Sequence, residues 1–232
     1  MTAKETIQQG KAILGIEFGS TRIKAVVIDE ENKPIAQGSH TWENQLVDGL
    51  WTYSIDTIWN GLQDCYADLR ANVLKEFGVE IETFAAIGIS AMMHGYMAFN
   101  EKDEILVPFR TWRNTNTGKA AAELSSLFNY NIPLRWSISH LYECILEDNE
   151  HVKDIKFQTT LAGYIHWQLT GEKVHIEALH ILNNVEGIGV VNLDRRDIVR
   201  HKLVTKIVNA YEEYDKERNN NNETQRYKEA EE

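Results

Sequence analysis

Residues 16–22, Ile-Glu-Phe-Gly-Ser-Thr-Arg, combine a single carboxylate with a glycine turn and small hydroxyl side chains. Backbone N–H groups in such a turn can bind an anion, and the hydroxyls of Ser20 and Thr21 can donate to it as well. A carboxylate repels phosphate unless a divalent cation lies between them, and Mg²⁺ needs only one carboxylate because it keeps several waters. The predicted magnesium and nucleotide-phosphate residues are Glu17, Gly19, Ser20, Thr21 and Arg22, with Glu17 as the metal ligand. The alternative is an ordinary β-hairpin with exposed polar residues.

Two later stretches carry side chains that are suited to a sugar. His94 stands in a turn within Ser90–Gly95, and a neutral imidazole can both donate to and accept from a hydroxyl. Further along, Trp112 could lie against the face of a sugar, while Arg113 and Asn114 bind hydroxyls or phosphate. The alternatives are a turn histidine that the fold itself satisfies and an aromatic core residue beside a solvated arginine.

The elements that must position these residues follow from the apolar pattern. Residues 55–77 place apolar side chains on one face of a helix, with Ser54 as its cap and Gly78 at its end. The remaining elements are predicted as a buried strand at 84–90, strands at 12–17, 22–29, 34–42 and 105–109, and helices at 118–128 (capped by Thr117), 137–147 and 159–169. The first three strands form an antiparallel meander, and the whole order predicts a mixed α/β fold.

The pattern changes after Gly171. We expect a helix at 175–184, a strand at 187–193 and a helix at 194–214 that Asp194 caps. The last residues, 215–232, are polar and include four consecutive asparagines, which predicts a disordered tail.

Composition limits the classes of partner and the location that we expect for the chain. The net charge of −11 implies no broad basic surface, so we expect no nucleic-acid partner. Cys65 and Cys144 stand far apart, which fits a reducing compartment. No stretch reaches the length of a membrane span and no apolar signal core opens the sequence, so we expect no membrane partner and a cytoplasmic location. The Gly-x-x-x-x-Gly-Lys-Ser/Thr phosphate loop is absent as well.

Residues 16–29 resemble the first phosphate motif of the superfamily of sugar kinases, actin and Hsp70 ATPases, and within it the FGGY carbohydrate kinases. Those proteins usually have Asp at the position of Glu17. Met93-His94-Gly95 is similar to a turn that lines the sugar pocket of xylulokinase-like members, which have Gln at the position of Met92.

Two more stretches carry the resemblance. Trp112-Arg113-Asn114 is similar to a stretch of the pentulose kinases in which Asp is more usual at the position of Asn114, and residues 160–172 resemble a family helix that ends in Thr-Gly-Glu. Residues 12–174 thus look like the N-terminal domain of xylulokinase-like and ribulokinase-like enzymes. This implies a ribonuclease H-like α/β fold, Mg²⁺ with ATP as co-substrate, and a small sugar substrate. The implied sugar-binding residues are Met93, His94, Gly95, Trp112, Arg113 and Asn114.

The family pattern breaks off after Glu172. FGGY kinases have a catalytic aspartate near the end of the first domain and a second domain that completes the ATP site, and we assign that aspartate to no residue here. Residues 176–211 instead resemble the C-terminal end of PhoH-like P-loop ATPases, which indicates a chimera. The predicted division is a lead at 1–11, an incomplete kinase domain at 12–174, a foreign helix-strand-helix segment at 175–214 and a disordered acidic tail at 215–232.

Three hypotheses for function follow. The first is ATP-dependent phosphorylation of a ketopentose-like sugar, by family resemblance, with this chain an incomplete and inactive fragment. The second is sugar or phosphate binding without catalysis, and the third is a PhoH-related nucleotide-linked protein. A domain cut before its final elements would expose core surface, so we also expect self-association.

Overall fold

A computed structural model describes residues 1–173 of the chain. The predictions for residues 174–232, which include both helices, the strand, the foreign segment and the disordered tail, lie outside the described residues. The elements are α1 (Ala3–Gln8), β1 (Ile13–Phe18), β2 (Arg22–Ile28), β3 (Pro34–Thr41), β4 (Gln45–Val47), β5 (Leu50–Thr52), α2 (Ile55–Phe77), β6 (Ala86–Ser90), β7 (Met97–Phe99), α3 (Gly118–Phe128), α4 (Ser137–Leu146), a 3₁₀ turn (Glu150–Asp154), β8 (Phe157–Thr159) and α5 (Leu161–Thr170).

The main sheet has four strands in the order β3-β2-β1-β6. The first three strands form the predicted antiparallel meander, and β6 runs parallel to β1. Alternate residues of β1 are buried (Leu14, Ile16 and Phe18), as expected for a strand with one face on the core. Parallel pairing aligns Glu17 with Ser90, so the carboxyl ends of β1 and β6 lie side by side.

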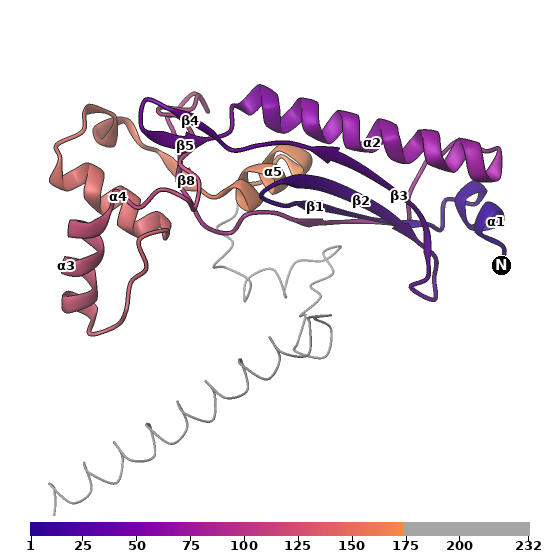
Figure 1. Cartoon of the computed structure of the whole chain (residues 1–232), viewed down its shortest axis with the longest axis horizontal. Coiled ribbons are helices and arrows are strands. Elements are labelled where there is room, and N and C mark those ends of the chain that lie inside the picture. Colours follow the sequence, from indigo (N-terminus) through magenta and orange to yellow (C-terminus); the bar gives the residue numbers. More distant parts are fainter. Residues whose placement is uncertain (174–232) are drawn as a thin grey trace, which may run out of the picture. The chain divides into compact units, whose positions relative to one another are not determined.

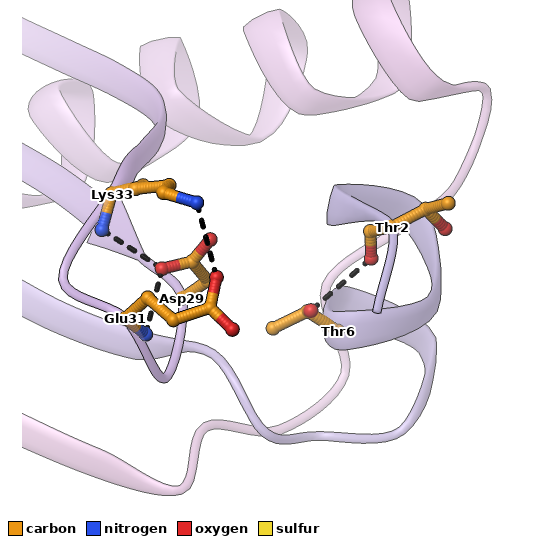
Figure 2. Close-up of polar contacts among 5 residues, drawn as sticks. All are labelled: Thr2, Thr6, Asp29, Glu31 and Lys33. Atoms are coloured by element: carbon orange, nitrogen blue, oxygen red, sulfur yellow. Dashed lines mark hydrogen bonds and ion pairs between the residues drawn. The ribbon is translucent and has the colours of Figure 1, made fainter.

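The turn between β2 and β3 is held by its own side chains. The Asp29 Oδ1 atom accepts hydrogen bonds from the backbone N–H groups of Glu31 at 2.9 Å and Lys33 at 2.8 Å (Figure 2). Asn32 has a φ of 62°, a left-handed conformation that asparagine tolerates better than most residues. Figure 2 also shows α1, where the Thr6 hydroxyl donates to the backbone carbonyl of Thr2.

The long helix α2 lies along the sheet (Figure 1) and has the bounds that the sequence predicts. The Ser54 side chain caps it by accepting from the N–H of Thr57, and Gly78 ends it with a φ of 64°. The helix approaches β3 very closely at Gly38, where an added Cβ atom would lie 2.4 Å from the backbone nitrogen of Leu69. This residue must therefore lack a side chain.

The two outer edges of the main sheet differ. On β3, the N–H of Ser39 donates to the carboxylate of Asp68 at 2.9 Å, and the carbonyl of Gln37 accepts from the Asn72 amide at 2.9 Å. Side chains of α2 thus occupy backbone groups of that edge. At the other edge, no strand within residues 1–173 pairs with the outer side of β6.

Three predictions need correction. The strand at 84–90 forms as β6, but it is not buried: Ile87 is 58% exposed, because among residues 1–173 nothing covers it. Residues 105–109 form no strand, and within them Ile105 makes one isolated bridge, to Phe99. Thr117 precedes α3, but its hydroxyl donates to the carbonyl of Leu134 and makes no cap.

Strands β7 and β8 pair antiparallel and contribute aromatic residues to the core. The ring of Phe99 stacks on Tyr164 of α5, with ring centroids 5.7 Å apart, and meets Trp167 edge-on. These contacts link the region after β6 to the same core. In the described part of the chain, no helix combines the length and the apolar character that crossing a membrane requires.

Candidate functional site

A cleft of about 330 Å³ opens at the carboxyl ends of β1 and β6. It is lined by Glu17, Phe18, Gly19, Ser20, Ser90, Ala91, Met92, Met93, His94 and Trp112. The predicted phosphate turn thus meets the His94 stretch, about 70 residues later in the chain, and Trp112, about 90 residues later, at one place. The parallel pairing of β1 with β6 causes this, because the two strands end at the same edge.

The turn between β1 and β2 has an unusual pattern of backbone contacts. The carbonyl oxygens of Gly19, Ser20 and Thr21 accept, in order, from the indole N–H of Trp42 at 2.8 Å, the hydroxyl of Tyr53 at 2.5 Å and the backbone N–H of Trp42 at 3.2 Å. The N–H groups of Ser20 and Thr21 have no partner among the described residues. An anion in the cleft could take them up.

Glu17 stands at the mouth of this turn. Its carboxylate is mostly exposed and lies 3.9 Å from the Lys24 ammonium, its register partner on β2. Within residues 1–173, no three metal-ligating side chains gather at one place. One open carboxylate beside free amides fits a magnesium ion that reaches the protein together with phosphate and water ligands, rather than a preformed metal cage. Thr21 in the turn and Arg22 at the start of β2 are both exposed, and neither lines the cleft.

His94 faces the same cleft from the loop after β6. Burial, and then the nearby Arg135 cation, lower the pKa of His94, so the imidazole is neutral at pH 7. Its ring stacks on Trp136, with 6.4 Å between ring centroids. The neutral form can donate and accept at once, as binding a hydroxyl requires. Met93 beside it is 64% exposed.

Gly95 turns the loop away from the cleft and back into the fold. Its φ is 118°, and an added Cβ atom would lie 2.6 Å from the carbonyl oxygen of Arg110. Behind it, Tyr96 and Arg110 exchange both backbone hydrogen bonds, at 2.9 and 3.0 Å. This bridge ties the His94 loop to the stretch that contains Trp112.

The three residues of the third predicted stretch, 112–114, do not all face the cleft. Trp112 is 42% exposed and lines the cleft. The guanidinium of Arg113 instead lies over the ring of Trp51 at 3.6 Å from the ring centroid. The buried Asn114 amide accepts from the N–H of Trp51 at 2.9 Å and donates to the Trp51 carbonyl at 2.8 Å. Arg113 and Asn114 therefore hold the wall behind Trp112, and neither lines the cleft.

The structure adds residues that the sequence pattern did not single out. Ser90 lines the cleft beside Glu17, its register partner, and its position at the end of a strand next to the predicted His94 turn is a signal that could have identified it. Trp42 and Tyr53 contact the turn from 23 and 33 residues away. No local pattern marks such contacts.

The family comparison matches the chain over most of its length. Residues 12–197 match the model of the N-terminal domain of the FGGY family of carbohydrate kinases. The match begins where the predicted domain begins and continues past residue 174, where the sequence predicts that it ends. No comparison supports the resemblance of residues 176–211 to PhoH-like ATPases, and a search of curated proteins gave no match.

Several solved structures share the fold. A xylulose kinase from Rhodospirillum rubrum has a TM-score of 0.61 and 17% identity, over 71% of this chain and 35% of that one. A xylulose kinase from Lactobacillus acidophilus has 0.55 and 22%, over 70% and 34%. A glycerol kinase from Plasmodium falciparum, solved with ADP, has 0.54 and 16%, over 69% and 34%. These likenesses show the fold that the sequence predicts, and the chain spans about a third of the length of these structures.

Proposed function

Because the chain belongs to the FGGY family of carbohydrate kinases, we propose that its cleft binds a small sugar next to the phosphate end of MgATP, for phosphoryl transfer to a sugar hydroxyl. The observation that carries the proposal is the shared cleft: Glu17, Gly19 and Ser20 line it together with His94 and Trp112. Phosphoryl transfer depends on positioning donor and acceptor side by side with a metal ion.

The phosphate end would use the turn after β1. Glu17 would hold Mg²⁺, directly or through water, while the N–H groups and hydroxyls of Ser20 and Thr21 bind phosphate oxygens. Gly19 lets the backbone come close to the anion. Arg22, exposed at the edge of the turn, would offset phosphate charge from outside the cleft.

The sugar end would use the loop after β6. We assign hydroxyl binding to the neutral His94 and stacking against the sugar to Trp112, with Met93 covering the ligand and Gly95 fixing the loop. Arg113 and Asn114, which the sequence assigns to the ligand, would act by holding the wall around Trp51. Relatives that carry the name xylulose kinase favour a ketopentose such as xylulose or ribulose as the substrate class.

Binding without turnover is the second candidate. It rests on the cleft itself, because a site that brings Glu17, His94 and Trp112 together can bind a sugar or a phosphate whether or not turnover follows. Sugar kinases need a base for the hydroxyl proton and a full set of contacts to ATP.

We also propose a reducing cytoplasm as the location, because both cysteines are buried free thiols.

A coupled ADP-release assay over a panel of pentuloses tests the kinase proposal, with Glu17→Ala as control. Turnover that Glu17→Ala abolishes supports it, whereas equal signal from both proteins counts against it. Calorimetry with xylulose and ribulose then separates the second candidate from an inert chain. Binding that is lost in His94→Ala supports a binding module, and no heat with either sugar excludes it.

A further inference from the structure

Two buried aromatic residues converge on the β1–β2 turn from different parts of the chain. Trp42 follows β3 directly, and Tyr53 follows β5 just before the cap of α2. Both are at least 95% buried, and their rings stack with centroids 4.2 Å apart and planes 25° apart. Such a pair is rigid, because each ring restricts the rotamers of the other.

The polar atoms of this pair do not face solvent or each other. The indole N–H of Trp42 donates to the carbonyl oxygen of Gly19 at 2.8 Å, and the hydroxyl of Tyr53 donates to that of Ser20 at 2.5 Å. Both contacts reach the backbone of the turn and leave its side chains free. A buried donor that lost its acceptor would be costly, so each contact resists displacement of the turn.

Because the peptide unit is planar, these contacts also determine where the N–H groups on the opposite side of the turn point. In a trans peptide unit, the carbonyl of one residue and the N–H of the next point in opposite directions. Holding the Gly19 carbonyl toward Trp42 therefore directs the N–H of Ser20 away from the core, and holding the Ser20 carbonyl does the same for the N–H of Thr21. These are the two turn amides without a partner in the described chain.

We propose that Trp42 and Tyr53 are positioning residues that keep the amides of Ser20, which lines the cleft, and of the neighbouring Thr21 directed at one anion bound at the edge of the cleft. The inference rests on the proposed function, because it takes phosphate as the anion. It adds two residues that contact neither metal nor phosphate and act only through the backbone. Burial raises the pKa of Tyr53, which keeps its hydroxyl protonated and able to donate.

The test uses the full chain and variants that each remove one side-chain donor, with almost no change of volume in Tyr53→Phe and with loss of one ring of the indole in Trp42→Phe. Tyr53→Phe and Trp42→Phe delete the two donors but keep aromatic rings. Tyr164→Phe is the matched control, because it also removes a buried tyrosine hydroxyl, one that accepts from the indole N–H of Trp59 at 3.1 Å and has no contact with the turn. Backbone amide resonances of Ser20 and Thr21 are recorded by nuclear magnetic resonance, without ligand and then during titration with magnesium pyrophosphate.

We expect Tyr53→Phe to shift the Ser20 and Thr21 amide resonances before any ligand is added and to weaken magnesium pyrophosphate binding about three- to tenfold, as loss of one hydrogen bond would. Tyr164→Phe should lower the melting temperature without either effect. Unchanged amide resonances in both Tyr53→Phe and Trp42→Phe would overturn the positioning role. If the unaltered chain binds no magnesium pyrophosphate, the proposed function fails at this site and phosphate is not the anion, whereas amide shifts in the two variants would still show that Trp42 and Tyr53 orient the turn.

Discussion

The two turns of the N-terminal meander differ in which backbone groups, N–H or carbonyl, have side-chain partners. In the turn between β2 and β3, the Asp29 carboxylate accepts from two backbone N–H groups, so the turn completes itself with its own side chain. In the turn between β1 and β2, Trp42 and Tyr53 occupy carbonyl oxygens instead, and the N–H groups of Ser20 and Thr21 have no partner in the part of the chain that the structure describes. Both turns join neighbouring antiparallel strands, so strand pairing does not cause the difference.

The difference separates a turn built for stability from one built for binding. Free backbone donors at a surface cost little in water, and they are available to an anion. In a turn whose N–H groups already donate to its own carboxylate, those groups are not available to an anion, and the carboxylate would repel phosphate. Four substitutions test this contrast.

Trp42→Ala should have the largest effect. It removes a buried ring, the stack with Tyr53 and the donor to Gly19, and we expect it to lower the free energy of unfolding by about 3–5 kcal/mol. Chemical denaturation followed by circular dichroism measures this. Trp112→Ala, at an exposed tryptophan, is the control and should cost about 0.5 kcal/mol. Equal losses in the two variants would contradict a supporting role for Trp42.

Gly19→Ala should come next. An added Cβ atom would lie 2.9 Å from the carbonyl oxygen of Arg22, which accepts the hydrogen bond that closes this turn. We expect a loss of about 1–3 kcal/mol in unfolding free energy and weaker magnesium pyrophosphate binding. Thermal unfolding and calorimetry measure the two quantities. Wild-type affinity in a folded variant would show that the close approach at Gly19 is not needed.

Asp29→Ala should affect stability alone. It leaves two backbone N–H groups of the β2–β3 turn without their acceptor, for a cost of about 1 kcal/mol because the turn is exposed and water replaces part of the bond. Asp29→Asn keeps an acceptor oxygen and should cost less. Magnesium pyrophosphate affinity is measured for both and should not change. A drop in affinity would mean that the two turns are coupled.

Asn32→Gly should have the smallest effect. Asn32 already adopts a left-handed φ of 62°, which glycine adopts without strain, so the free energy of unfolding should change by about 0.5 kcal/mol or less. Asn32→Val, which is strained at this φ, should cost more. Denaturation midpoints of the two variants give the comparison, and similar midpoints would show that the turn tolerates any residue here.

The sequence predicts best what local rules decide. Helix α2 has its predicted bounds, because Ser54, Gly78 and the spacing of apolar residues act within one or two turns of chain. The meander and the mixed α/β class follow in the same way from alternation and turn chemistry. The positions of the predicted phosphate and sugar stretches at one cleft required the family resemblance.

Contacts between distant residues could not be predicted. Asn114 bonds to Trp51, 63 residues earlier, and that partner removes its amide from the cleft. The short strands β4 and β5, which lead into Tyr53, were not predicted either, because three residues are too few for a periodic signal. The apolar run in β6 indicates a buried strand, but burial depends on which other element covers it.

The partly occupied edge at β3 also bears on assembly. Two copies of residues 1–173 that met through β6 would pair these two edges, and the resulting pair would present two β3 edges where Asp68 and Asn72 already bond to Ser39 and Gln37. Within residues 1–173, strand addition is therefore disfavoured at β3 and unobstructed at β6, whereas a sheet with two open edges can extend into a fibre. For residues 1–173, the Asp68 carboxylate and the Asn72 amide of α2 thus oppose the addition of a strand at β3.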